Sequence, residues 1–438
     1  MRTRQRTLAA LVIVATLLAM APGGAADEAP AAVEARGAPL GSEFRINETL
    51  TPRMDSQPAA VWSEATDQYL VVWMDRRNPS TYTDIYGQLV SSAGAAVGAN
   101  LQITGPAAIG HDSLPAVAWN ETRGQYLVVW ADGRNWNTRG NDIYGQRVSA
   151  TGERLRGNFR ISGDAATAEE AQPSVAWNAD TNEYLVVWED RRNVASGYGS
   201  DIYGQRVSAA GERLSGDFRI SRAESGQFDA AVVWNSQVNE YLVVWSDQRN
   251  NPTRRLDIYG QRVSAAGTRL GGNFRISGTG ALEDDTEPMV AYNADANQYL
   301  VVWEDRRLGG YSVSDIYGRR VSGDGKRLGA DFRISGLTWS SGGLLPVVAW
   351  NAKAGEYLVV WSDRRNESAS GYDIYGQEVR ASGRLDGGNF RISGAGATAH
   401  EGAPGIAYSG PLNQYLVVWQ DKRAGYDDWD IWGRRVSG

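Results

Sequence analysis

An all-β fold, a seven-bladed β-propeller with four antiparallel strands per blade, is the fold class that the sequence predicts. Three observations lead to it: a repeat, its strand-like segments, and the way the repeat is cut at the two ends of the chain. The string YLVVW occurs seven times, starting at Tyr69, Tyr126, Tyr184, Tyr241, Tyr299, Tyr357 and Tyr415. A fixed period of 57 or 58 residues marks an architecture in which one supersecondary unit recurs.

Each repeat contains four short segments with strand character. In the third copy they are PSVAWN (173–178), EYLVVWED (183–190), DIYGQRVS (201–208) and DFRIS (217–221). They are rich in Val, Ile, Tyr and Trp and are bounded by turn residues, and no window shows sustained helical periodicity. YLVVW is apolar throughout, which predicts a strand covered on both faces. The Trp residues of the first two segments are expected to pack between blades.

The ends of the chain favour a closed ring. The first recognisable segment, EFRIN (43–47), matches the fourth strand of a unit, and the last, DIWGRRVS (430–437), matches the third. The N-terminal strand is therefore expected to complete the last blade. Such complementation removes two exposed sheet edges, which a solenoid would not require.

The N-terminal segment indicates export. Residues 1–26 combine a basic start with an apolar run too short to span a bilayer, followed by small residues, as in a signal peptide. Residues 27–41 are rich in Ala, Pro and Glu and are expected to be a disordered leader, with the propeller over 42–438. The protein is expected to be secreted or periplasmic and monomeric. A net charge of −7 and the absence of cysteine argue against nucleic-acid binding, membrane insertion and thiol chemistry.

The chain resembles secreted bacterial propellers with highly repetitive YLVVWxDxR and DIYGQRVS blades. The resemblance covers residues 43–438 and implies the architecture only. The blades lack the Gly-His and Trp-Asp pair of WD repeats, the double Gly of kelch repeats and the SxDxGxTW box of sialidases. No functional residue is carried over from it.

Asp and Arg recur two residues apart after every YLVVW string. This pattern allows either a cation site in each blade or a charge-assisted network that fixes the hairpin of the second and third strands. The nearby Arg already supplies the countercharge, so the sequence favours the network. The pairs are Asp75/Arg77, Asp132/Arg134, Asp190/Arg192, Asp247/Arg249, Asp305/Arg307, Asp363/Arg365 and Asp421/Arg423.

Loops that differ between blades are the first candidate for a functional surface. The loops between the second and third strands carry aromatic residues flanked by Asn, Ser and Gly, a composition that suits stacking against sugar rings. The alternative is that each aromatic folds over its own blade. These loop aromatics and Trp339, which lies in another loop, are the candidate ligand-binding residues. They are Tyr82, Trp136, Tyr198, Tyr311, Trp339, Tyr372, Tyr426 and Trp429.

The segments that precede the first strands are the second candidate. Five of the seven carry an acid at one position, and the only two His residues lie beside it. His, Met and carboxylate groups could hold a metal ion at the channel mouth, and a His–carboxylate pair could act as acid and base. The alternative is a solvated acidic rim. The candidate residues are Met54, Asp55, His111, Asp112, His400 and Glu401.

Three functions remain open from the sequence. The first is a secreted binding module that takes a glycan or an extracellular protein on its variable loop face. The second is an extracellular hydrolase or lyase with an acidic and His-containing site at the channel mouth. The third is a purely structural or adhesive propeller. The near-equivalence of the blades, and the lack of HExxH or phosphate-loop motifs, lead to the first as the main expectation.

Overall fold

The computed structural model describes residues 37–48, 54–78, 82–105, 110–163, 168–194, 199–221, 223–250, 255–278, 283–307, 314–336, 342–394, 399–425 and 428–438. The chain divides into two units, residues 1–34 and 35–438, and all described residues belong to the second. The predicted signal peptide lies outside the described residues.

Over the described residues the fold is all-β, and its 28 strands form antiparallel four-stranded units, two of which a short parallel bridge joins into one sheet of eight strands. The first strands of the sheets are β2 (Ser56–Ser63), β6 (Gly110–Asn120), β10 (Glu170–Asn178), β14 (Gln227–Asn235), β18 (Asp285–Asn293), β22 (Gly343–Asn351) and β26 (Glu401–Ser409). The second strands, which contain YLVVW, are β3 (Gln68–Asp75), β7 (Gln125–Asp132), β11 (Glu183–Asp190), β15 (Glu240–Asp247), β19 (Gln298–Asp305), β23 (Glu356–Asp363) and β27 (Gln414–Gly425).

The third and fourth strands lie further from the axis. The third strands are β4 (Tyr82–Ser91), β8 (Asp142–Ser149), β12 (Asp201–Ser208), β16 (Asp257–Ser264), β20 (Asp315–Ser322), β24 (Asp373–Arg380) and β28 (Asp428–Ser437). The fourth are β5 (Ala96–Gln102), β9 (Arg154–Arg160), β13 (Arg213–Arg219), β17 (Arg269–Arg275), β21 (Arg327–Arg333), β25 (Leu385–Arg391) and β1 (Pro39–Arg45). Two one-turn helices, α1 (Trp136–Arg139) and α2 (Glu367–Ser370), lie in loops between second and third strands.

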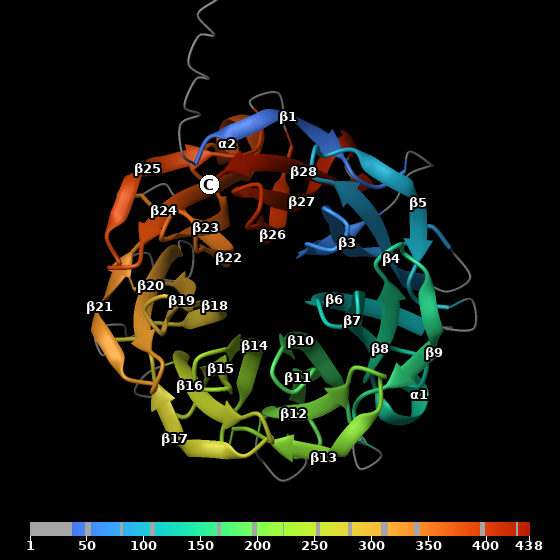
Figure 1. Cartoon of the computed structure of the whole chain (residues 1–438). Coiled ribbons are helices and arrows are strands. Elements are labelled where there is room, and N and C mark those ends of the chain that lie inside the picture. The colour runs from blue at the N-terminus through green and yellow to red at the C-terminus, as the bar shows by residue number, and fades with distance from the viewer. Residues whose placement is uncertain are drawn as a thin grey trace, which may run out of the picture. The chain divides into compact units, whose positions relative to one another are not determined.

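The sheets are arranged radially, with the first strands nearest the axis (Figure 1). Each first strand contacts the first strand of the next sheet, and β26 contacts β2, so the inner strands form a closed cycle. A two-residue parallel bridge, Tyr82 with Gly110 and Thr83 with His111, also joins β4 to β6. The arrangement is that of a β-propeller.

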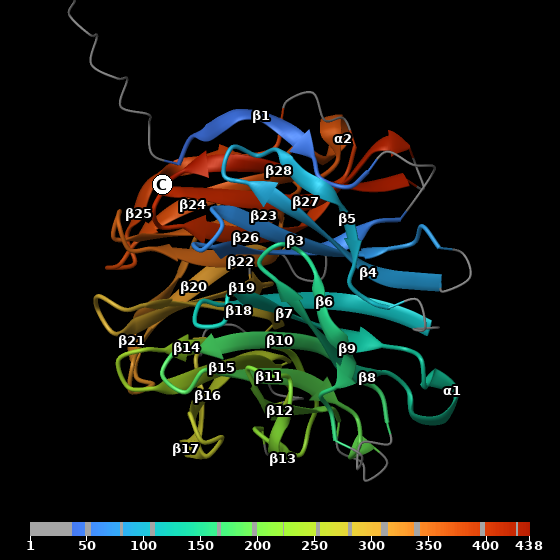
Figure 2. The ribbon, with the colours of Figure 1, turned by 45° about the vertical axis from the view of Figure 1, so that its right-hand side comes forward.

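Strand β1 closes the ring, as expected. It pairs antiparallel with β28, with Phe44 opposite Gly433, and Figure 2 shows the two strands side by side although they come from opposite ends of the chain. The strand begins at Pro39, so residues 39–41 of the expected leader belong to the fold, which corrects that boundary. The reason is backbone pairing: Pro39 lies opposite Val436 and Leu40 opposite Arg435.

The YLVVW strands form the core between neighbouring sheets. The Trp of each copy is fully buried, at 0% exposure, and the residues on its two sides pack against different neighbours. One cluster joins Leu185 and Val187 of β11 to Tyr241, Val243 and Trp245 of β15. Burial on both faces explains why the string is apolar at every position.

The recurring Asp–Arg pairs form the predicted hairpin network. Arg192 donates to Asp190, which is fully buried, and also to Asp217 of β13 at 2.7 Å. Its guanidinium lies 4.0 Å from the ring centroid of Tyr203 on β12. One Arg therefore ties the second, third and fourth strands together. The described residues contain no helix of the length and hydropathy that crossing a membrane would require.

Candidate active site

Every inner strand carries a β-bulge near its start. The register of pairing shifts at this point in each sheet, for example between Phe228 and Ala231 in β14 and between Thr286 and Met289 in β18. One residue of each bulge has a left-handed backbone, with φ between 46° and 57°. Bulges re-aim side chains and are frequent beside active sites. The seven residues are Gln57, Leu114, Gln172, Asp229, Glu287, Leu345 and Ala403.

Only two of these bulge residues are acids, Asp229 and Glu287, and they lie on the neighbouring strands β14 and β18. The equivalent side chain on the next strand, Leu345, is 38% exposed, so the bulge position is open to solvent. Asp229 and Glu287 are themselves partly exposed. Two carboxyl groups that solvent can reach thus occupy the same bulge position on neighbouring inner strands.

The pKa of Glu287 is strongly raised. Burial, followed by the negative charges of Asp229 and Glu304, raises the pKa of Glu287 to about 8. A carboxyl group with such a pKa keeps its proton at neutral pH and can donate it. Clefts in which a carboxyl pKa is strongly raised by a specific partner are candidate functional sites.

Two further acids, which lie on second strands, complete what we call the bulge carboxylate site, defined as Glu189, Asp229, Glu287 and Glu304. Burial is the largest cause of the raised pKa of both Glu189 and Glu304, and the charge of Asp229 adds to it in each. Asp229 is therefore the common neighbour of the other three acids.

Hydrogen bonds fix two members of the site. The hydroxyl of Ser246 on β15 donates to Asp229 Oδ2 at 3.1 Å. The backbone N–H of Leu345 on β22 donates to Glu304 Oε1 at 2.7 Å, which holds Glu304 against the next sheet. Positioned carboxylates of this kind are what acid–base chemistry on a bound substrate needs.

The acids predicted at the channel mouth are not a solvated rim. Asp55, Asp112, Glu170, Asp285 and Glu401 are between 0% and 1% exposed. Asp112 lies opposite Asp132 in the sheet, beside the Asp–Arg network, and burial raises its pKa to about 9. These residues face into the sheets because the bulge that follows them changes the register.

The six residues predicted as a metal site are not brought together as one. Among the residues with assigned positions, no group of three or more His, Asp or Glu side chains is placed to hold a metal ion. The two His residues pack against aromatic rings instead: His111 against Tyr82 and His400 against Tyr372, with centroids 4.7 and 4.8 Å apart. Met54 Sδ accepts a hydrogen bond from Arg76 at 3.2 Å.

Four of the predicted loop aromatics are described. Tyr82 and Trp136 are exposed at 55% and 57%, Tyr372 contacts His400, and Lys422 Nζ lies 4.6 Å from the ring centroid of Trp429. The other four, Tyr198, Tyr311, Trp339 and Tyr426, lie outside the described residues.

Sequence reasoning missed Asp229 and Glu287, although a signal was present. Both stand two residues after the recurring acid position, where the other copies carry Gln, Leu or Ala. A carboxylate present in only two copies is not required by the repeated core. The bulge at which each of them lies cannot be read from the strand pattern.

No family model matches the chain, and no curated protein matches it in sequence. Its fold is similar to that of an α-L-arabinanase from Penicillium chrysogenum complexed with arabinobiose, with 13% identity, a TM-score of 0.51, and coverage of 74% of this chain and 93% of that one. An α-L-arabinofuranosidase from Fusarium graminearum, in complex with an iminosugar inhibitor, has 14% identity, a TM-score of 0.52 and the same coverage, 74% and 93%.

A sialidase from Streptococcus pneumoniae is similar over more of the chain. It has 10% identity and a TM-score of 0.50, and the match covers 91% of this chain and 71% of the sialidase. At such identities the likeness concerns the fold. All three solved neighbours are glycoside hydrolases built on β-propellers.

These neighbours correct the main functional expectation. The main expectation from the sequence was a binding module that uses its variable loop face. This expectation is wrong, because the similar folds are those of enzymes that act on carbohydrates. The alternative, an extracellular hydrolase, fits them better. The preference against an enzyme rested on the near-equivalence of the blades, which the unique pair Asp229 and Glu287 breaks.

Proposed function

We propose that this protein is an exported glycoside hydrolase whose catalytic groups are Glu287 and Asp229. The observation that carries the proposal is the raised pKa of Glu287, about 8, caused by burial and by the charge of Asp229 next to it. Hydrolysis of a glycosidic bond generally needs two carboxyl groups, one that donates a proton and one that is negatively charged.

In this proposal Glu287 is the general acid. It gives its proton to the glycosidic oxygen while the bond between that oxygen and the anomeric carbon breaks. In an inverting route Asp229 accepts a proton from the water that attacks the anomeric carbon. In a retaining route Asp229 attacks the anomeric carbon itself, and water then displaces Asp229 while the Glu287 carboxylate accepts the proton of that water. The hydroxyl of Ser246 orients Asp229, and Glu304 acts through its charge on Glu287.

The surroundings of the pair suit a sugar. Met289 and Leu345, on the strands that carry and follow Glu287, expose 36% and 38% of their surface close to the bulges. Apolar side chains beside a few positioned polar groups are typical of small-molecule sites. A glycan is therefore the partner we propose.

The same proposal includes the finer architecture and the location. Seven copies of YLVVW, one per sheet, support a propeller of seven blades. The basic and apolar residues 1–26 support export through a signal peptide, and polysaccharides outside the cell are then the accessible substrates.

The test begins with residues 27–438 and a panel of polysaccharides, arabinan among them, and aryl glycosides. On the best substrate, Glu287→Gln and Asp229→Asn should each lower kcat/KM by about 100-fold or more, the usual contribution of a general acid or base. Glu224→Gln is the matched control, since Glu224 is exposed in the loop that leads into β14. Unchanged activity in both site variants, or no hydrolysis of any glycoside, would overturn the proposal.

A further inference from the structure

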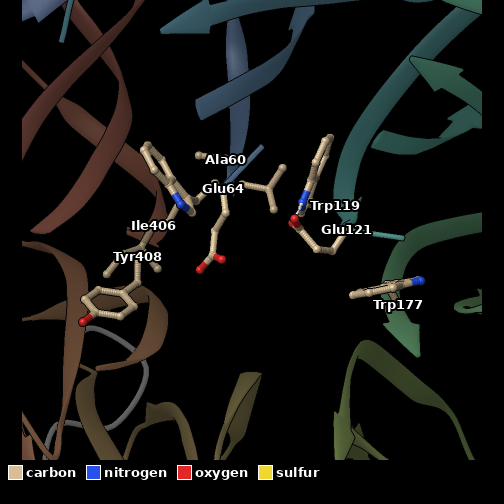
Figure 3. Close-up of a pocket in the computed structure, with 10 residues that line it drawn as sticks. Ala60, Glu64, Trp119, Glu121, Trp177, Ile406 and Tyr408 are labelled. Atoms are coloured by element: carbon tan, nitrogen blue, oxygen red, sulfur yellow. Dashed lines mark hydrogen bonds between the residues drawn. The ribbon is translucent and has the colours of Figure 1, made fainter. Parts of the chain in front are cut away.

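A cavity lies at the end of the inner strands opposite the bulges. It has a volume of about 440 Å³ and is formed where β2, β6, β10 and β26 end, whereas the bulges lie where these strands begin. Figure 3 shows its side chains converging from several strands on one open space. Its walls include Trp62, Trp119, Trp177 and Tyr408, together with the carboxylates of Glu64 and Glu121.

The aromatic walls are fixed in place. Trp62 and Trp119 are 7% and 9% exposed, and each packs on the Tyr that begins the adjacent YLVVW string, with ring centroids 4.6 Å apart. Tyr408 packs on Tyr415 in the same way at 5.0 Å. The residues expected only to pack between blades therefore also present aromatic surface to a cavity. A rigid aromatic wall loses little entropy when it binds a ligand.

The charged side chains that line the cavity are all acidic. Its lining contains two carboxylates and no Lys, Arg or His. Arg147 of the same sheet as Glu121 is used elsewhere, since it donates to Gln125 and to the Ala209 carbonyl. A cavity with this charge and these walls attracts a positively charged ligand.

Glu64 and Glu121 occupy equivalent positions but differ in their hydrogen bonds. Trp119 Nε1 donates to Glu121 Oε2, which pins that carboxylate against its own strand. Trp62 Nε1 is buried and has no hydrogen-bond partner among the described residues. Figure 3 shows Glu64 extending between Tyr408 and Glu121, and its Oε1 lies 3.8 Å from where a Cβ on Gly410 would stand. Among the described residues, the exposed carboxylate of Glu64 is therefore not held by the indole N–H of Trp62 as the carboxylate of Glu121 is by that of Trp119.

The fold does not require these acids. The five other copies have small residues at the same position, two after the aromatic residue of the inner strand: Ala179, Ser236, Ala294, Ala352 and Gly410. All copies share the same core, so the two glutamates serve something other than packing. They follow β2 and β6, which belong to two of the three adjacent blades whose Trp residues line the cavity.

We propose that this cavity binds an organic cation of the methylated or quaternary ammonium type. The faces of Trp and Tyr attract such groups through their quadrupoles, and the carboxylates supply the countercharge. A bare metal ion does not fit, since no group of three acids or His among the described residues is placed to coordinate one. The site is separate from Asp229 and Glu287 and does not depend on the hydrolase proposal.

Choline and tetramethylammonium are the probes, with tryptophan fluorescence and calorimetry as readouts. Both cations should bind saturably to residues 27–438. The uncharged choline isostere 3,3-dimethylbutan-1-ol should bind about tenfold more weakly or not at all, since it fills the same volume without the charge. Added salt should weaken the binding of the cations.

Variants locate the site. Glu64→Gln/Glu121→Gln should weaken choline binding about tenfold or more while leaving the melting temperature unchanged, because both side chains are exposed. Glu153→Gln, an exposed acid in a turn at the same end of the sheets, is the matched control. Equal binding of the uncharged isostere, tighter binding of a neutral saccharide than of choline, or full affinity in the double variant would each overturn the proposal.

Discussion

Asp229 and Glu287 occupy the same bulge position on two adjacent inner strands, and the charge of Asp229 contributes to a Glu287 pKa of about 8. Equivalent positions elsewhere in the ring carry Gln, Leu or Ala. A nearly symmetric repeat therefore contains one asymmetric pair of carboxyl groups. The pair combines the two properties that distinguish an active site from a structural ion pair, a perturbed pKa and access to solvent.

The pH dependence of activity should follow Glu287. A general acid works in its protonated form, so kcat/KM for an uncharged glycoside should fall about tenfold per pH unit above pH 8, where Glu287 loses its proton. Glu304→Gln removes one of the charges that raise this pKa and should move the alkaline limb to lower pH. Initial rates at pH 5–10 measure both effects. An alkaline limb that stays in place in Glu304→Gln would show that another group controls it.

The buried acids should make folding stability depend on pH. Burial raises the pKa of Asp112 and Glu401 to about 9 and that of Glu170 to about 8. Their folded-state pKa values lie above the unfolded ones, so their stabilisation is complete below about pH 4 and is lost as pH rises through about 8 to 9.

Urea midpoints measured from pH 4 to pH 9 should therefore decrease, and Asp112→Asn, which stays neutral, should reduce the slope. Stability that rises over this interval would contradict the assignment of these acids as protonated. Glu212→Gln, at an exposed turn, should leave the slope unchanged.

The Asp–Arg network should be structural. Asp190→Ala removes the main partner of Arg192, whose side chain is only 12% exposed, and should cost about 3–5 kcal/mol. Asp180→Ala, in an exposed turn of the same sheet, should change stability by about 0.5 kcal/mol or less. Denaturant unfolding distinguishes the two. An Asp190→Ala variant as stable as the parent would show that Arg192 keeps enough contacts through Asp217 and Tyr203.

Closure by β1 should be needed for solubility. Deleting residues 27–36 should leave the melting temperature nearly unchanged, because β1 begins only at Pro39. Deleting 27–47 removes β1 and the ion pair of Glu43 with Arg423, and leaves β28 as an unpaired edge that favours aggregation. Equal solubility of the two truncated proteins would argue against closure by this strand.

The fold could be read from the sequence largely because each signal is repeated. Any single YLVVW is a weak strand prediction, but seven copies with fixed companions define the unit, and the cut ends predict closure. The Asp–Arg network followed from the same regularity. The candidate site could not be predicted from this regularity, because its geometry depends on the bulges.

The one extra residue that each bulge inserts reverses the face that the preceding side chains occupy. Asp112 and Glu401, expected at an open mouth, are therefore buried. Trp62 and Trp119 were assigned to packing alone, since an alternating pattern does not show which strand end borders a cavity. Comparing the copies position by position, rather than looking for shared residues, brings out Asp229, Glu287, Glu64 and Glu121.

The role of Glu287 as proton donor is the central claim, and leaving-group dependence tests it most directly. For the parent protein and Glu287→Gln, kcat/KM is compared between a glycoside with a poor leaving group and its 2,4-dinitrophenyl counterpart, whose leaving group departs without a proton. The account predicts that the variant loses about 100-fold or more on the first substrate and little on the second. An equal loss on both substrates, or none on either, would contradict it.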